Sequence, residues 1–173
     1  MGYGDAGDGS APDADTVFEA ASLTKPLFAY LVMTLVDEGV VDLERPILEY
    51  LPEERVEEAL GHGLDAEGFR RDWFEAITVR QVLSHSAGLP HGDGGAVTTV
   101  FFEPGSDWKY SAEGYVLLQR TVEEITGLGL DELVGPLVRY LASRAPAGDD
   151  EELRLRTSLR ELAEACELSM HET

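Results

Sequence analysis

The segment from Ser22 to Glu38, "SLTKPLFAYLVMTLVDE", is the most apolar stretch of this 173-residue chain. Leu27, Leu31 and Leu35 recur four residues apart, so they share one face of a helix. Gly39 follows the last apolar turn, and glycine is favoured just beyond the end of a helix. The apolar run is too short to span a bilayer. The segment therefore predicts a strong helix, in a chain long enough for one domain with its own core.

The remaining patterns predict a chain that is mostly helical with few strands. Thr16–Ala20 is a short apolar stretch that favours a strand. Helices are expected over Pro46–Leu51, part of Glu53–Asp72, Thr78 to Gly88, Ala112–Thr126, Leu130–Ser143 and a last segment capped by Asp149 or Asp150. Pro104-Gly105 predicts a turn between the third and fourth of these helices. The expected fold class is thus α+β and predominantly helical.

The charge balance is extreme, with 34 acidic against 13 basic residues, a net charge of −21 and a pI near 4.3. No basic stripe exists, so we expect no nucleic-acid partner. Anionic membranes would repel the chain as well. The simplest interpretation of the charge is a solvated surface. A spread of acids with arginine in place of lysine is also typical of halophilic proteins, in which salt screens the self-repulsion.

No metal or cofactor is indicated. The four histidines are scattered without ligand spacing, and no glycine-rich stretch follows a nucleotide-binding pattern. The single cysteine, Cys166, excludes an internal disulfide and is expected to be buried on the last helix. The first residues are polar and show no signal peptide, so the compartment stays unknown, with the cytoplasm as the default.

Ser22 and Lys25 carry the pattern that suggests chemistry. Serine is a poor nucleophile until a base takes its proton, and a lysine of lowered pKa can be that base. Residues three apart share one face of a helix. Ser22 would also lie in the first turn, where free N–H groups and the helix dipole favour negative charge. The same spacing fits a simpler structure, in which Ser22 caps the helix and Lys25 extends along its surface.

Three blocks give the spacing a context: "TVFEAASLTKPLFAYLVMTLVDEGVVDLERPILEYLPE", "ITVRQVLSHSAGLPHG" and "FFEPGSDWKYSAEGYVLLQRTVEEITG". In this order they resemble the serine beta-lactamase and penicillin-binding-protein-like superfamily, above all its class C beta-lactamase, esterase and D-aminopeptidase branch. The resemblance covers about residues 1 to 140. It implies the helical lobe of the beta-lactamase/transpeptidase-like fold, with a remnant of its antiparallel sheet. Residues 1–145 would form this partial domain, and residues 146–173 an amphipathic helix that is not clearly family-like.

The resemblance implies a catalytic role for three residues. Ser22 matches the acylated nucleophile, Lys25 the lysine that activates it, and Tyr110 the tyrosine of the family's Y-x-N element, which also protonates the leaving group. A tyrosine of ordinary pKa is too protonated to be a base at neutral pH, but a nearby lysine cation would lower that pKa. His85 lies in the "LSHSAGLP" block, for which a packing or hydrogen-bonding role is expected. The alternative for Tyr110 is a half-buried aromatic residue without a catalytic role.

Two departures from the family pattern stand out. Ala112 occupies the third position of Y-x-N, so binding of amides or beta-lactams is in doubt. No K-T-G or H-x-G element, which lines the family's site on a strand, follows Tyr110. Family members are also about twice as long, so we expect a truncated version with an incomplete sheet.

We therefore expect a serine hydrolase that cleaves ester or amide bonds of small substrates through an acyl-enzyme. The alternative is a non-catalytic fragment or interaction module that retains family motifs. The expected partners are a small-molecule substrate and, through an exposed sheet edge or the last helix, a second copy or a complementing chain.

Overall fold

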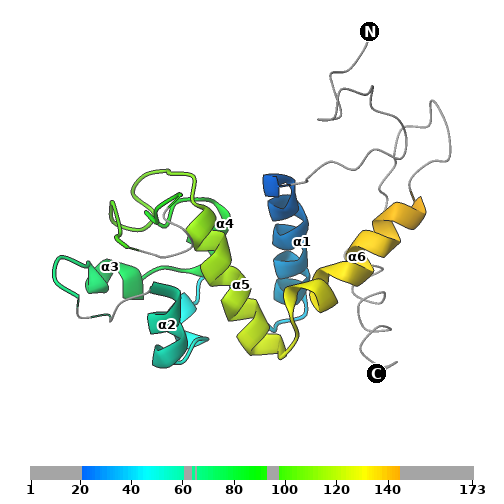
Figure 1. Ribbon diagram of the computed structural model, residues 1–173, viewed down its shortest axis with the longest axis horizontal. Coiled ribbons are helices and arrows are strands. Elements are labelled where there is room, and N and C mark those ends of the chain that lie inside the picture. Colours follow the sequence, from blue (N-terminus) through cyan, green and yellow to red (C-terminus); the bar gives the residue numbers. More distant parts are fainter. Residues whose placement is uncertain (1–20, 61–63, 65, 93–97, 145–173) are drawn as a thin grey trace, which may run out of the picture.

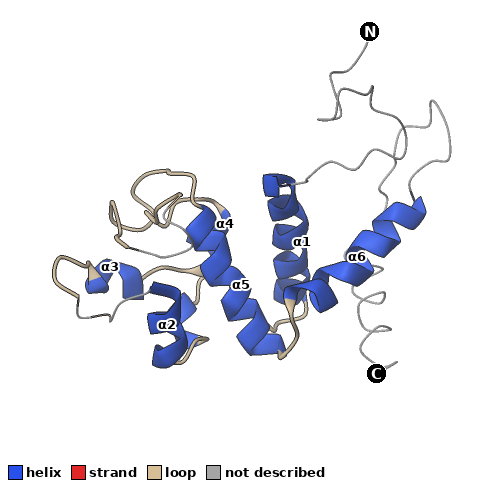
Figure 2. Cartoon of the chain, in the orientation of Figure 1, coloured by secondary structure: helices blue, strands red, loops and turns tan. Residues whose placement is uncertain are grey.

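The computed structural model describes residues 21–60, 64, 66–92 and 98–144, which form helices and loops (Figures 1 and 2). The elements are η1 (Ala21–Leu23), α1 (Thr24–Asp37), η2 (Ile47–Glu49), α2 (Glu53–Leu60), α3 (Arg71–Glu75), α4 (Val79–Leu83), α5 (Ala112–Thr126) and α6 (Leu130–Arg144). The expectation of a predominantly helical chain is confirmed over these ranges. They contain no strand, only one isolated antiparallel bridge between Pro46 and Thr78. The strand expected over Thr16–Ala20, the helix expected over 146–173 and Cys166 lie outside the described residues.

Helix α1 stands between α5 and α6 (Figure 1). Leu31 and Leu35 of the predicted apolar face are buried, together with Phe28 and Val32, all exposed by 9% or less, whereas Leu27 is only partly buried. Burying each such side chain stabilises the fold by about 1.5–3 kcal/mol. Their partners on α5 and α6 come from Leu117, Leu118, Val122, Leu133 and Val134, which belong to the same core. The core therefore fixes α1 relative to α5 and α6.

Helix α4 begins as predicted but ends early. Thr78 caps it in a reciprocal capping box with Gln81. The prediction that this helix extends to Gly88 is wrong, because it ends at Leu83. His85 has a φ of 58°, a left-handed value that no α-helix contains. The chain instead makes a tight turn that is closed by a 2.8 Å hydrogen bond from the Ser86 N–H to the Gln81 carbonyl.

This turn binds the segment that leads to Tyr110. The Phe101 N–H donates to the Gly88 carbonyl and the Gly105 N–H donates to the Ser86 carbonyl, both at 2.8 Å. The predicted turn at Pro104-Gly105 is present, with Gly105 at a φ of +88°. Two segments that are distant in sequence are thereby held side by side.

Helix α5 has the predicted bounds, and both ends are fixed. Ser111 is its N-cap: its buried hydroxyl accepts from the Gly114 N–H at 2.8 Å and donates to the Pro90 carbonyl at 2.6 Å. Gly127 ends the helix in the left-handed conformation, as expected for a glycine at that position. Tyr110 therefore directly precedes a cap that is anchored to a neighbouring loop.

Candidate active site

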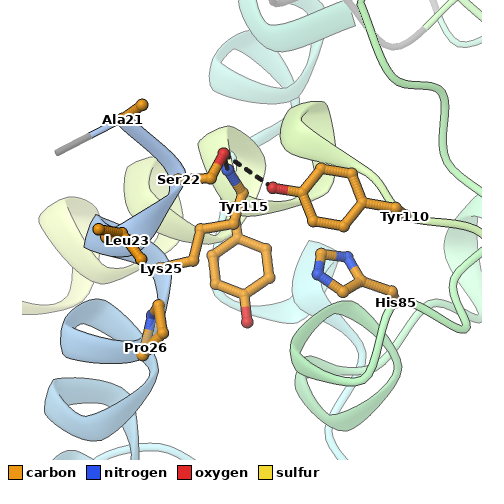
Figure 3. Close-up of a pocket in the computed structure, with 8 residues that line it drawn as sticks. All are labelled: Ala21, Ser22, Leu23, Lys25, Pro26, His85, Tyr110 and Tyr115. Atoms are coloured by element: carbon orange, nitrogen blue, oxygen red, sulfur yellow. Dashed lines mark hydrogen bonds between the residues drawn. The ribbon is translucent and has the colours of Figure 1, made fainter. Parts of the chain in front are cut away.

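Ser22, Lys25 and Tyr110 meet at the start of α1 (Figure 3). The Lys25 ammonium donates to Ser22 Oγ at 3.1 Å, and the Tyr110 hydroxyl donates to the same atom at 2.9 Å. Ser22 is exposed, whereas Lys25 and Tyr110 are partly buried. The structure thus brings together all three residues that the sequence singled out, although Tyr110 is 88 positions away from Ser22.

The backbone before Ser22 is strained. Ala21 has a φ of 44°, and left-handed backbone costs a residue with a side chain about 1–2 kcal/mol. A short 3-10 turn, η1, carries Ser22 from this residue into α1. The turn brings Ser22 Oγ within hydrogen-bonding distance of Lys25, three residues later. The expectations that Ser22 lies in the first turn of the helix or caps it are wrong, because α1 begins at Thr24 and its N-cap is Leu23, with no side-chain cap. Such strain is common where a fold positions a reactive group.

Electrostatics at the site favour ionisation of the Tyr110 phenol. The Lys25 side chain, and after it the hydrogen bond with Ser22, lower the pKa of Tyr110 from its ordinary value of 10. The Lys25 ammonium also lies 5.3 Å from the centre of the Tyr110 ring. The sequence-based expectation that a lysine cation lowers the pKa of this tyrosine is confirmed in direction.

His85 lies beneath Tyr110 and makes the packing and hydrogen-bonding contacts expected of it (Figure 3). Its ring centre is 4.5 Å from that of Tyr110 and 5.1 Å from that of Tyr115. Its Nδ1 accepts the Ser111 N–H at 3.2 Å. Burial, and then the charge of Lys25, lower the pKa of His85 from its ordinary value of 6.5, which favours the neutral imidazole.

Ser22, Lys25 and Tyr110 line a pocket of about 510 Å³. It is lined by Ala21, Ser22, Leu23, Lys25, Pro26, His85, Tyr110 and Tyr115. Pockets of roughly 300–1,000 Å³ accommodate small organic ligands. The chemistry that such a pocket allows is attack by an exposed hydroxyl that has a cation and a titratable phenol within hydrogen-bonding distance.

A smaller cavity of about 170 Å³ adjoins the pocket and shares Lys25 and Tyr115 with it. Its walls are Thr24, Lys25, Phe28, Ala112, Tyr115, Val116, Gln119 and Leu130. Sequence reasoning did not single out Tyr115. The signal that could have found it is helical spacing, because a residue three positions after Ala112 lies on the same face of α5.

His91 lies at the edge of the site. Its ring is edge-on to Tyr110 at 4.9 Å between centres, and its Nδ1 is 4.0 Å from Glu113 Oε2. The buried Glu113 carboxylate accepts the Gly92 N–H with both oxygens, at 3.0 and 3.2 Å. Among the described residues, no three His, Cys, Asp or Glu side chains are grouped to hold a metal ion. Within the same ranges, no helix is both long and apolar enough to cross a membrane.

Comparison with known proteins adds evidence on the family of the chain. The family Beta-lactamase matches residues 1–139. The chain belongs to this family. It is 30% identical to penicillin-binding protein 4 of Amycolatopsis lactamdurans over 179 aligned positions, which cover 91% of the chain and 43% of that protein. It is 29% identical to esterase EstB of Burkholderia gladioli, with 80% of the chain and 40% of EstB covered.

A solved structure agrees with this membership of the Beta-lactamase family. The D-stereospecific amidohydrolase from Streptomyces sp. superposes with a TM-score of 0.58 at 25% identity, over 74% of the chain and 43% of the amidohydrolase. The predicted resemblance and the beta-lactamase-like fold are therefore confirmed. The chain spans less than half the length of each of these three relatives.

Proposed function

We propose that this Beta-lactamase-family chain is a serine hydrolase that cleaves ester or amide bonds of small substrates through an acyl-enzyme on Ser22. The observation that carries the proposal is the convergence of Lys25 Nζ and Tyr110 Oη on Ser22 Oγ. The relatives named as an esterase and an amidohydrolase support the reaction class. The proposal requires no metal and no cofactor.

The first half-reaction forms the acyl-enzyme. When Tyr110 is a phenolate, the hydrogen bond between Tyr110 and Ser22 reverses, and the serine hydroxyl donates its proton to the phenolate. Ser22 Oγ attacks the carbonyl carbon of the substrate while the Lys25 ammonium stabilises the developing alkoxide. Tyr110 then gives its proton to the departing alcohol or amine as the bond to the leaving group breaks. Lys25 and Tyr110 therefore act as one coupled unit.

The second half-reaction regenerates the enzyme. A water molecule takes the place of the leaving group, and the Tyr110 phenolate accepts one of its protons as the oxygen attacks the acyl carbon. Collapse of the tetrahedral intermediate releases the carboxylic acid, and Ser22 Oγ recovers a proton through Tyr110. The reaction is a hydrolysis without redox change.

The walls near Lys25 favour esters over amides. Ala112 presents a methyl group where the family's asparagine would offer an amide to the substrate. Next to it, the cavity of about 170 Å³ has apolar walls from Phe28, Val116 and Leu130. A liquid water occupies about 30 Å³, so this space suits an acyl group of a few carbons. We therefore propose short apolar esters as the preferred substrates.

The alternative, a non-catalytic module, has one observation in its favour. The 173 residues contain no K-T-G or H-x-G element after Tyr110. Losing one oxyanion-hole donor typically lowers the rate by about 10²–10³. We propose that polypeptide other than the described residues completes the family's sheet, from this chain, a second copy or a complementing chain. Without that additional polypeptide, we expect slow acylation by activated esters and negligible turnover of cephalosporins.

Intact-mass measurement after incubation with a fluorophosphonate tests the proposal. We expect one adduct, mapped to Ser22, and none in Ser22→Ala. Ser106→Ala is a matched control, because Ser106 is exposed, its hydroxyl donates to the nearby Glu103 carbonyl, and it does not line the pocket. Labelling that persists in Ser22→Ala, or maps to another serine, contradicts the assignment. No labelling of the wild-type chain would favour the non-catalytic module.

A further inference from the structure

His85 binds the backbone on both sides of Tyr110. Its carbonyl oxygen accepts the Lys109 N–H at 2.9 Å. Its side-chain Nδ1 accepts the Ser111 N–H at 3.2 Å. The two amides that flank the tyrosine are therefore held by one residue, and the ring of that residue also lies against the phenol.

The left-handed backbone of His85 makes this double contact possible. At a φ of 58°, the carbonyl and the side chain both face the same neighbouring segment. Histidine, asparagine and aspartate are the side-chain-bearing residues most often found at positive φ. Because Nδ1 accepts a backbone N–H, the proton of the neutral ring must reside on Nε2.

We propose that His85 is a positioning residue that fixes the Tyr110 hydroxyl on Ser22 Oγ, by holding the Lys109 and Ser111 amides from opposite sides of the tyrosine. This inference rests on the proposed function insofar as Tyr110 exchanges protons with Ser22. It adds a residue that does not touch the substrate's reacting atoms but determines where the proton-transfer group lies. Displacing a catalytic group by about 1 Å can cost about 10²-fold in rate.

Protonation of His85 should release this arrangement. The imidazolium has no acceptor lone pair at Nδ1, so the bond from the Ser111 N–H would be lost. The titratable groups that face the ring are Lys25 on α1, Tyr110, Tyr115 on α5 and His91. A second cation beside Lys25 would also be repelled. Both effects act in the same direction, so acidification should move the Tyr110 hydroxyl away from Ser22.

Three substitutions separate the hydrogen bond from the packing. His85→Ala removes both the acceptor and the ring. His85→Asn retains an acceptor near the position of Nδ1 and tolerates positive φ, but has no ring. His85→Phe retains a ring and has no acceptor. As a matched control, Tyr50→Phe removes the hydroxyl that accepts the Asp42 N–H at 2.8 Å, a single backbone contact outside the pocket lining.

The primary readout is the titration of Tyr110, followed by ¹³C NMR of its ring, which requires no turnover. We expect Tyr110 of the wild-type chain to titrate below its ordinary pKa, and His85→Ala to return it toward about 10 because its contacts with Lys25 and Ser22 are lost. His85→Asn should restore most of the lowered pKa, and Tyr50→Phe should leave it unchanged. A Tyr110 titration that is unchanged in His85→Ala, or is restored by Phe rather than Asn, overturns the proposal.

The second readout is the rate of fluorophosphonate labelling at Ser22. It should fall by about 10- to 100-fold in His85→Ala. It should recover in His85→Asn, which should keep the decline due to protonation of Tyr110 but lose the additional, steeper decline that protonation of the imidazole adds at lower pH. A Tyr50→Phe variant that slows labelling as much would show a general stability effect and refute the positioning role. If the wild-type serine is not labelled, the proposed function fails, and the Tyr110 titration still decides whether His85 holds the tyrosine.

Discussion

Gly88 occupies a position where one added methyl group should disturb both the fold and the site. Its φ is +75°, which costs a residue with a side chain about 1–2 kcal/mol. A Cβ built at Gly88 would lie 2.6 Å from the Phe102 carbonyl oxygen, and 3.2 and 3.3 Å from side-chain atoms of Val100 and Phe102. The backbone must therefore move, because a carbonyl cannot rotate away as a side chain does.

The magnitude follows from adding the two effects. Overpacking of this kind typically costs about 1–3 kcal/mol. With the backbone strain, Gly88→Ala should lower the free energy of unfolding by roughly 2–5 kcal/mol. Gly39→Ala is the matched control: its φ is +74° and nothing lies within 4 Å of its Cβ, so only the strain of about 1–2 kcal/mol applies.

Urea unfolding followed by far-ultraviolet circular dichroism measures both variants. The Gly88→Ala variant should lose more stability than Gly39→Ala by about 1–3 kcal/mol. Because Gly88 accepts the Phe101 N–H, the displaced segment continues to Tyr110, and labelling of Ser22 should slow only in the Gly88 variant. Equal losses of stability in the two variants would refute the close-approach argument.

Three further outcomes are expected. The rate of Ser22 labelling should rise with pH through a midpoint below 10, because Lys25 lowers the pKa of Tyr110 and the phenolate is the base. Lys25→Met should move that midpoint upward, and an unmoved midpoint would exclude Tyr110 as the titrating group. At a net charge of −21, the thermal midpoint should rise between ~0.01 M and ~1 M potassium chloride, as the Debye length falls from ~30 Å to ~3 Å; a constant midpoint would mean that the acids are well separated. Ala112→Asn should narrow the cavity beside Lys25 and reduce the ratio of butyrate to acetate ester hydrolysis, a ratio that stays constant if acyl groups do not enter there.

Local signals predicted those parts of the fold whose boundaries are set locally. The predicted bounds of helix α5 agree with the structure at both ends, because its apolar spacing and Gly127 at its end are signals that can be read from neighbouring residues. Helix α4 was predicted five residues too long, because "SHSAG" contains no helix-stopping residue before Gly88. The left-handed turn at His85 is stabilised by contacts with Lys109 and Ser111, which are distant in sequence and invisible to periodicity.

In the candidate site too, only the contacts between residues close in sequence could be predicted from local signals. The pairing of Ser22 with Lys25 follows from helical spacing alone. Tyr110 could be placed near them only through family resemblance, since no physical rule links residues 88 positions apart. The double contact of His85 with the backbone around Tyr110 could not be predicted from the sequence, because it depends on the left-handed φ angle of His85. The expected sheet and the role of the acidic surface in salt remain predictions.

The contact between Ser22 and Tyr110 makes the reactivity of the serine depend on tertiary packing. The contact between Lys25 and Ser22 is local, because the two residues are three positions apart, but the Tyr110 phenol reaches Ser22 only when the start of α5 docks beside α1. A chain with intact helices and loosened packing would retain its circular dichroism and lose its reactivity. Labelling of one hydroxyl would then report the native fraction in a crude extract, which would allow variants of this chain to be ranked by folding without purification.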